Sequence, residues 1–250
     1  MRIVETVTSA PRQRSAERPD WRPIVDSIVL PVCSWATWGE EQCNTQPQVG
    51  FIEPLVRRRL SFLDRIALHV AAACAPEGER VHLVFASRHG ELARSAELLA
   101  QIAKRELPSP MSFSLSVLNA APGLYGIARK DRSASSAVSG GEATFALALI
   151  EAAAQAWDQP DATVLLAFAD EPPPAVYQEI VDKPRIAHAI GVRMQSRAPR
   201  HSVRMGWTPA EGAEPSEEGV RRFAHCLAEG DSARWIAGGH EWRWSRDGNA

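Results

Sequence analysis

The sequence predicts an α/β fold with a mostly parallel core sheet flanked by helices. Two apolar runs, residues 81–87 and 163–169, have the length and continuity of strands that are buried on both faces. Around them, apolar residues recur at the three- and four-residue spacing of amphipathic helices. The third observation is a short strand, a turn and a helix over residues 132–157, which together with the strand at 163–169 form a βαβ unit.

The first half of the chain supplies two strands and two helices to this fold. We expect a strand in the β-branched run at 24–32, followed by a loop at 35–48. An amphipathic helix covers 54–75 and starts near its proline, which suits a first helical turn. After the strand at 81–87 a second helix covers 91–107, where Pro108 and Pro110 stop it.

The remaining segments are less uniform. Residues 111–117 alternate large apolar side chains with serine, which fits either a one-faced strand or the entry to a short helix at 117–125. A further strand is expected at 187–194 and a helix at 217–228. The tryptophan-rich end, residues 235–244, is expected to cover an exposed edge of the core.

The length and composition favour one sizeable core. The chain has 250 residues, of which 45% are hydrophobic. We expect a flexible N-terminal arm at residues 1–22, a main domain at 23–195, and a C-terminal extension at 196–250 that packs on the same domain. The formal net charge of −2 gives no electrostatic reason to expect a nucleic-acid partner.

Neither a membrane segment nor a metal site is expected. No run reaches the roughly 18 apolar residues of a membrane helix, and the N-terminus lacks the apolar stretch of a signal peptide. The cysteines, Cys33, Cys43, Cys74 and Cys226, are widely separated and form no disulfide or zinc pattern. These features favour a reducing cytoplasm, and no cofactor is expected.

The segment 135–142 leads from the predicted strand into the helix that follows. Gly140 and Gly141 permit a tight turn there, and the side chains of Ser139 and Glu142 have the spacing of a capping box at the helix start. A strand-to-helix turn suits a nucleophile, because the N–H groups of the helix start stabilise a thiolate. The residue at the turn is Val138, which cannot act as a nucleophile.

Other candidate groups have a structural interpretation that we favour. Ser136 or Ser139 could replace a missing thiol, but serine needs a base and no histidine follows until His188. The turn around His89 follows a strand, where α/β proteins place sites, but such turns are more often held by their own hydrogen bonds. The arginines at 57–59 point to different faces of a helix and, with Arg65, are expected to be solvated.

Three motifs carry a resemblance to a known family. Residues 85–91 (FASRHGE), 109–120 (SPMSFSLSVLNA) and 139–142 (SGGE) resemble the short β-ketoacyl synthase chain length factors of aryl polyene and xanthomonadin-type pigment clusters. The resemblance runs from about residue 24 to 194. It implies a thiolase-like fold, of which this chain matches a single N-terminal-type βαβαβαββ half. Val138 stands at the position of the ketosynthase cysteine, and the half that carries the active-site histidines has no counterpart.

The same resemblance implies a role without catalysis. A chain length factor pairs with a full-length ketosynthase and forms a wall of its acyl tunnel, and an acyl carrier protein serves the pair through that ketosynthase. The resemblance then implies a strand across the dimer axis formed by Arg132, Ser133, Ala134, Ser135, Ser136 and Ala137. It implies tunnel-facing side chains at Met111, Phe113, Leu115 and Leu118.

Two alternatives stay open at this point. One is a stand-alone acyl-thioester hydrolase or transferase that uses a serine near residues 135–142. The other is a homodimeric module that binds an acyl group or a carrier protein without a ketosynthase partner.

Overall fold

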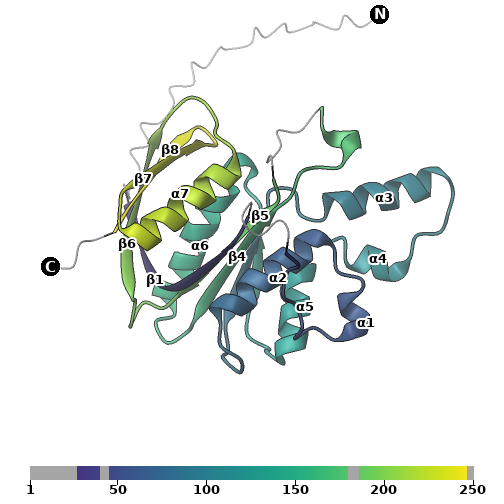
Figure 1. Cartoon of the computed structure of the whole chain (residues 1–250), viewed down its shortest axis with the longest axis horizontal. Coiled ribbons are helices and arrows are strands. Elements are labelled where there is room, and N and C mark those ends of the chain that lie inside the picture. Colours follow the sequence, from purple (N-terminus) through teal and green to yellow (C-terminus); the bar gives the residue numbers. More distant parts are fainter. Residues whose placement is uncertain (1–26, 40–44, 180–185, 247–250) are drawn as a thin grey trace, which may run out of the picture.

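The centre of the fold is an eight-stranded sheet with the strand order β3-β2-β4-β5-β1-β6-β8-β7 (Figure 1). The computed structural model describes residues 27–39, 45–179 and 186–246, so the arm expected at 1–22 lies outside the described residues. The strands are Ser27–Trp38 (β1), His82–Ala86 (β2), Ser135–Val138 (β3), Val164–Asp170 (β4), His188–Met194 (β5), His201–Pro209 (β6), Ala233–Ala237 (β7) and His240–Arg246 (β8). The α-helices are Pro54–Arg57 (α1), Phe62–Cys74 (α2), Leu92–Ala103 (α3), Pro110–Ser114 (α4), Ala120–Arg129 (α5), Thr144–Asp158 (α6) and Ser216–Glu229 (α7).

The sheet is mixed and mostly antiparallel, so the expectation of a mostly parallel sheet is wrong. Of the seven neighbouring strand pairs, only β2 with β3 and β2 with β4 are parallel. The apolar runs reflect burial on both faces, which helices impose on a strand of either direction. In β4, for example, Leu166 and Phe168 join the core on one face, and Leu165 and Ala167 join the core on the other.

Two helical layers produce these two cores. Helices α6 and α7 cover one face, and α2 and α5 cover the other, while α3 and α4 are set off to the side of the sheet (Figure 1). From β1 to β5 the elements follow the βαβαβαββ order implied by the resemblance. Residues 201–246 then add β6, α7, β7 and β8 to the same sheet.

The helix predicted over 54–75 is two helices, because a new cap interrupts it. Ser61 is the N-cap of α2: its hydroxyl accepts from the backbone N–H of Asp64 at 2.9 Å, and the Asp64 carboxylate accepts from the Ser61 N–H at 3.4 Å. This reciprocal pair satisfies two N–H groups that a helix start otherwise leaves without a partner. The chain therefore ends α1 at Arg57 and starts α2 at Phe62.

Two further predictions are corrected by local structure. Residues 110–114 form helix α4, not a one-faced strand, since Ser109 caps it and Pro110 occupies its first position. The loop predicted from residue 35 begins later, because β1 continues to Trp38 in antiparallel pairing with β5. Trp38 is buried and packs edge-on against His69 of α2.

The tryptophans of the C-terminal region lie in the core and do not merely cover an edge of it. The ring of Phe145, on α6, is surrounded by aromatic rings from β4, α7, β7 and β8. Ring-centroid distances from Phe145 are 5.2 Å to Phe168, 5.6 Å to Phe223, 6.3 Å to Trp235 and 6.2 Å to Trp244. All five side chains are fully buried, so the C-terminal strands and the sheet share one core.

Helix α2 approaches the sheet closely at Gly191 of β5. A Cβ built on Gly191 would lie 2.5 Å from the carbonyl oxygen of Val70 and 2.8 Å from the sulfur of Cys74. Only glycine permits this contact between helix backbone and strand backbone. The contact sets the distance between the α2 layer and the sheet.

Replacing Gly191 by alanine should therefore destabilise the protein by about 1–3 kcal/mol, because the added methyl group forces helix and strand apart. Denaturant unfolding followed by circular dichroism measures the change. The matched control is Gly123→Ala in α5, where a Cβ meets nothing within 4 Å. That variant should be neutral or slightly stabilising; equal losses in both variants would show that the contact at Gly191 does not set the spacing.

Candidate functional site

The strand-to-helix turn that is predicted to lack a nucleophile lies at the carboxyl end of β3. Val138 ends β3 and pairs with Ala86 of β2, and its carbonyl accepts a hydrogen bond from the Ser87 N–H at 3.3 Å. Its side chain is half-buried and packs against the core on the α6 face. A short 3-10 turn over Gly141–Ala143 then leads into α6. The elbow has the expected strand-turn-helix form, with an inert side chain at its tip.

The elbow is held by contacts other than the predicted capping box. The Thr144 hydroxyl accepts from the Gly140 N–H at 2.9 Å and donates to the Gly141 carbonyl at 2.6 Å. Glu142 instead accepts from the Gly238 N–H at 3.3 Å, at the tip of the β7–β8 hairpin. The backbone of Gly141 has φ +63°, a conformation that favours glycine. The Thr144 hydroxyl thus braces the turn, and the start of α6 has no side-chain cap, so the predicted capping box is wrong.

The two serines of the elbow are engaged in bracing contacts. Ser136 accepts a hydrogen bond from the Gln155 side chain at 3.2 Å, which ties β3 to α6. Ser139 donates to the Arg88 carbonyl at 3.0 Å. An amide donor and a backbone carbonyl cannot activate a hydroxyl as a histidine base does. These contacts support the structural interpretation of both serines.

Sequence reasoning missed a buried carboxylate beside the elbow. Asp170, at the end of β4, accepts from the Ser87 hydroxyl and from the Arg88 N–H, both at 2.8 Å. Burial raises the pKa of Asp170, although the facing charge of His188 and the bond from Ser87 act in the opposite direction. The turn that contains His89 is thus built around Asp170. The sequence signal for this carboxylate was the Asp170–Glu171 pair at the end of a buried apolar run. Because β2 and β4 are parallel, the pair lies beside the residues that follow β2.

The outer edge of β3 is the open edge of the described sheet. The carbonyls of Ala134 and Val138 accept from the N–H groups of Leu83 on β2 and of Ser87 directly after it. Since alternate residues of a parallel strand bond to opposite sides, Ser135 and Ala137 direct their backbone groups away from β2. Before β3, the Ser133 N–H donates to the Asp131 carboxylate at 2.9 Å.

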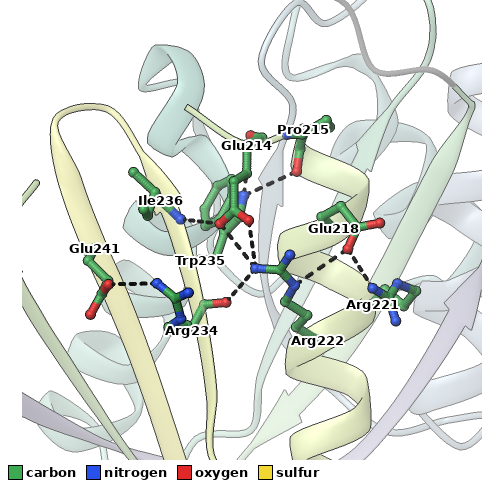
Figure 2. A network of polar contacts seen from close by, with 9 residues as sticks. All are labelled: Glu214, Pro215, Glu218, Arg221, Arg222, Arg234, Trp235, Ile236 and Glu241. Atoms are coloured by element: carbon green, nitrogen blue, oxygen red, sulfur yellow. Dashed lines mark hydrogen bonds and ion pairs between the residues drawn. The ribbon is translucent and has the colours of Figure 1, made fainter. Parts of the chain in front are cut away.

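The other edge of the sheet is closed by a polar network (Figure 2). Glu214 donates its N–H to the Ile236 carbonyl at 2.8 Å, and its carboxylate accepts from the Ile236 N–H at 2.9 Å. Arg222 of α7 donates to the Arg234 carbonyl at 2.9 Å. These contacts occupy backbone groups of β7 that an edge strand would otherwise present to another chain. The two edges of the sheet therefore differ: β7 is covered, and β3 is not.

Large apolar side chains are exposed on α3, α4 and the segments around them. They are Leu99, Ile102, Leu107, Met111, Phe113 and Val117. Of the four predicted tunnel residues, Phe113 is 65% exposed and Met111 46%, while Leu115 is only 7% exposed. Leu118 is partly buried and packs against the α2-side core. The structure thus separates the four into two that face outward and two that pack within the chain.

The cysteines of the described residues are unpaired, and they are not part of a metal-ligand cluster. Cys33, Cys74 and Cys226 are free thiols, and Cys43 lies outside the described residues. Burial raises the pKa of Cys74 to about 12, which keeps this thiol protonated. The described residues contain no group of three potential metal ligands. In the same residues, every helix is too short or too polar to cross a membrane.

Comparison with known proteins gives one family and a set of solved structures. The model of the β-ketoacyl synthase N-terminal domain matches residues 35–245. A chain from the complex of the ketosynthase ApeO with its chain length factor ApeC, from Xenorhabdus doucetiae, superimposes with a TM-score of 0.72 at 24% identity. That match covers 88% of this chain and 100% of the other. Comparison with curated proteins gives no match.

Two further structures are more distant. The ishigamide ketosynthase/chain length factor matches with a TM-score of 0.49 and 17% identity, over 75% of this chain and 57% of that one. PksG, an HMG-CoA synthase from Bacillus subtilis, matches with a TM-score of 0.41 and 11% identity, over 81% and 52% of the two chains. The fold is thiolase-like, and the chain belongs to the β-ketoacyl synthase N-terminal domain family.

Proposed function

We propose that this protein is the noncatalytic chain-length-factor subunit of a ketosynthase heterodimer, in which it shapes the acyl tunnel of a full-length partner. The observation that carries the proposal is the combination at β3: an elbow that ends in Val138, beside an open strand edge. One feature removes the chemistry and the other offers a surface for a second chain.

The chemical argument concerns the nucleophile. A condensing enzyme must hold its acyl group as a thioester, and a valine side chain has no atom that can form one. The described neighbours of Val138 do not compensate, because Ser136 and Ser139 are braced by Gln155 and by the Arg88 carbonyl. The β7–β8 hairpin also packs against the elbow, and a Cβ on Gly238 would lie 2.7 Å from that of Ala143.

The interface argument concerns the asymmetry of the sheet. Uncovered strand edges are hazards that proteins close, as Glu214 and Arg222 close β7. An edge left open beside exposed apolar residues favours an interface. Leu147 of α6 is such a residue and lies beside the elbow, where a Cβ on Gly140 would be 2.4 Å from its Cδ1. Helix α6 is joined to β3 by the bond between Gln155 and Ser136. A partner strand could add to β3 and cover this helix face.

The tunnel assignment follows the exposed side chains. Met111 and Phe113 lie on α4 and are free to face a partner, whereas Leu115 and Leu118 support α4 from within the chain. We therefore assign the role of setting product length to Met111 and Phe113. The resemblance favours a carrier-bound aryl polyene as product, made in the cytoplasm, with the acyl carrier protein delivered through the ketosynthase.

A second candidate function uses the same open edge. Two copies of this chain could pair through β3 and form a homodimeric binding module. Size-exclusion chromatography with light scattering distinguishes the homodimer from the heterodimer. If the chain is a chain length factor, a co-expressed ketosynthase should replace the second copy of this chain in any homodimer. A ketosynthase that is fully active and correctly terminating without this chain would refute the proposal.

Ala137→Pro should weaken the heterodimer by more than about tenfold, because proline removes an edge hydrogen bond and adds a ring at the interface. Ala137 directs its N–H away from β2, so the isolated chain should keep its fold and its melting temperature. Co-purification with the ketosynthase and titration by calorimetry measure the effect. The control Ala137→Ser keeps the backbone donor and should bind normally; unchanged binding by the proline variant would place the interface elsewhere.

Replacing Phe113 by alanine should lengthen the product of the heterodimer, and replacing it by tryptophan should shorten it, with little change in the stability of this chain. Mass spectrometry of the released products measures the length. Val176→Ala, another exposed apolar position, is the control and should leave the product unchanged. Leu115→Ala should instead destabilise the fold by about 2–4 kcal/mol, since its side chain is buried. Identical product lengths from all Phe113 variants would contradict the assignment.

A further inference from the structure

Two buried carboxylates meet Arg94 where α3 joins the rest of the protein, and a third carboxylate lies close to one of them. Asp64 of α2 and Glu91 before α3 are buried, and Glu171 after β4 is half-buried. Arg94 of α3 donates to Glu91 at 2.8 Å and lies 3.8 Å from the Asp64 carboxylate. We call Asp64, Glu91 and Glu171 the acidic cluster.

The cluster is the principal attachment of the segment formed by α3 and α4, residues 92–114, which we call the α3–α4 arm. Leu98 is the one buried residue of α3, and the described side chains of α4 include none that is buried. Polar contacts between this arm and the rest of the protein outnumber its buried apolar residues. Ser61 donates to Glu91 at 2.5 Å, and Arg94 also donates to the Arg59 carbonyl at 3.1 Å. The arm is thus joined to the α1–α2 turn mainly through Glu91 and Arg94.

Arg94 carries one charge and pairs with both buried carboxylates, Asp64 and Glu91, so one of these two charges is left unbalanced. An ionised carboxylate away from water is costly, and like charges repel. Burial, followed by the charge of Glu91, raises the pKa of Asp64 to about 7, although Arg94 and the bonds from Ser61 act in the opposite direction. Burial, followed by the charges of Glu91 and Asp170, raises the pKa of Glu171 to about 7.

We propose that the acidic cluster is a proton-dependent latch that holds the α3–α4 arm against the body of the protein. Among the described residues, Arg94 and Glu91 face Asp64, and Glu91 and Asp170 face Glu171. Behind Asp170 lie His188 and His89, whose charges favour its ionised form. The latch is closed when a proton resides on the cluster.

The direction of the pH dependence follows from the two states of the arm. In the closed arm Asp64 keeps its proton up to about pH 7, whereas in an open, solvated arm it would titrate near its ordinary value of 3.8. Opening therefore releases a proton between these values. The opening equilibrium should become about tenfold more favourable for each pH unit up to about pH 7, and constant above it. If opening of the arm also exposes Glu171 to solvent, a second proton is released and the opening equilibrium depends more steeply on pH.

Hydrogen–deuterium exchange of the isolated chain tests the latch, with rates corrected for the intrinsic effect of pH. The protection of residues 92–103 should fall about tenfold or more per unit from pH 5 to pH 7 and then level off. Amides of the buried helix α6 report global unfolding and should be more protected at every pH. Protection of residues 92–103 that does not change between pH 5 and pH 7 would overturn the proposal.

Two variants locate the effect. Asp64→Asn is uncharged at all pH values and can still accept from the Ser61 N–H. Its opening releases one proton fewer, so the tenfold change in protection per pH unit that Asp64 causes should disappear. Glu97→Gln, an exposed carboxylate of α3, should keep the wild-type slope. A wild-type slope in Asp64→Asn would refute the latch. If that variant does not fold, carbon-13 NMR of the Asp64 carboxyl in the wild-type protein decides: a midpoint near 7 supports the latch and one below 5 refutes it. Because no ketosynthase is present, these results do not depend on the proposed function.

Discussion

The aromatic contacts around Phe145 are the interaction on which the rest of the structure depends. This side chain begins helix α6, directly after the elbow, and touches rings from β4, α7, β7 and β8. Aromatic side chains bury large areas, and such pairs add to stability beyond that area. Segments far apart in the sequence are therefore held at one point, directly after the elbow that follows β3.

This arrangement shows how the C-terminal strands and α7 extend the thiolase-like half within one sheet. Helix α6 is rich in alanine and buried on most of its circumference, so it needs cover on more than the sheet side. The C-terminal strands and α7 supply that cover, and Gly219 of α7 lets the helix approach to within direct contact of Trp235. With α6 fixed and β7 closed by Glu214 and Arg222, β3 is left as the edge that another chain can use.

The sequence predicted the individual elements better than their arrangement. The runs at 81–87 and 163–169 and the elbow at 138–142 were found because burial and glycine turns leave local patterns. Strand direction was not found, since a strand buried on both faces gives the same pattern in parallel and antiparallel pairing. The burial of the tryptophans and the presence of the acidic cluster could not be predicted for a related reason. The surroundings of Trp235, Asp64 and Asp170 are formed by residues distant in sequence.

The central claim is that this chain assembles with a ketosynthase but carries no acyl group itself. Mass spectrometry of the co-expressed complex, first native and then denatured after incubation with an acyl thioester donor, tests both parts at once. The account predicts a one-to-one heterodimer in which the acyl mass increment is found on the ketosynthase chain alone. An acyl increment on this chain, or its recovery as a separate species beside an active ketosynthase, would contradict it.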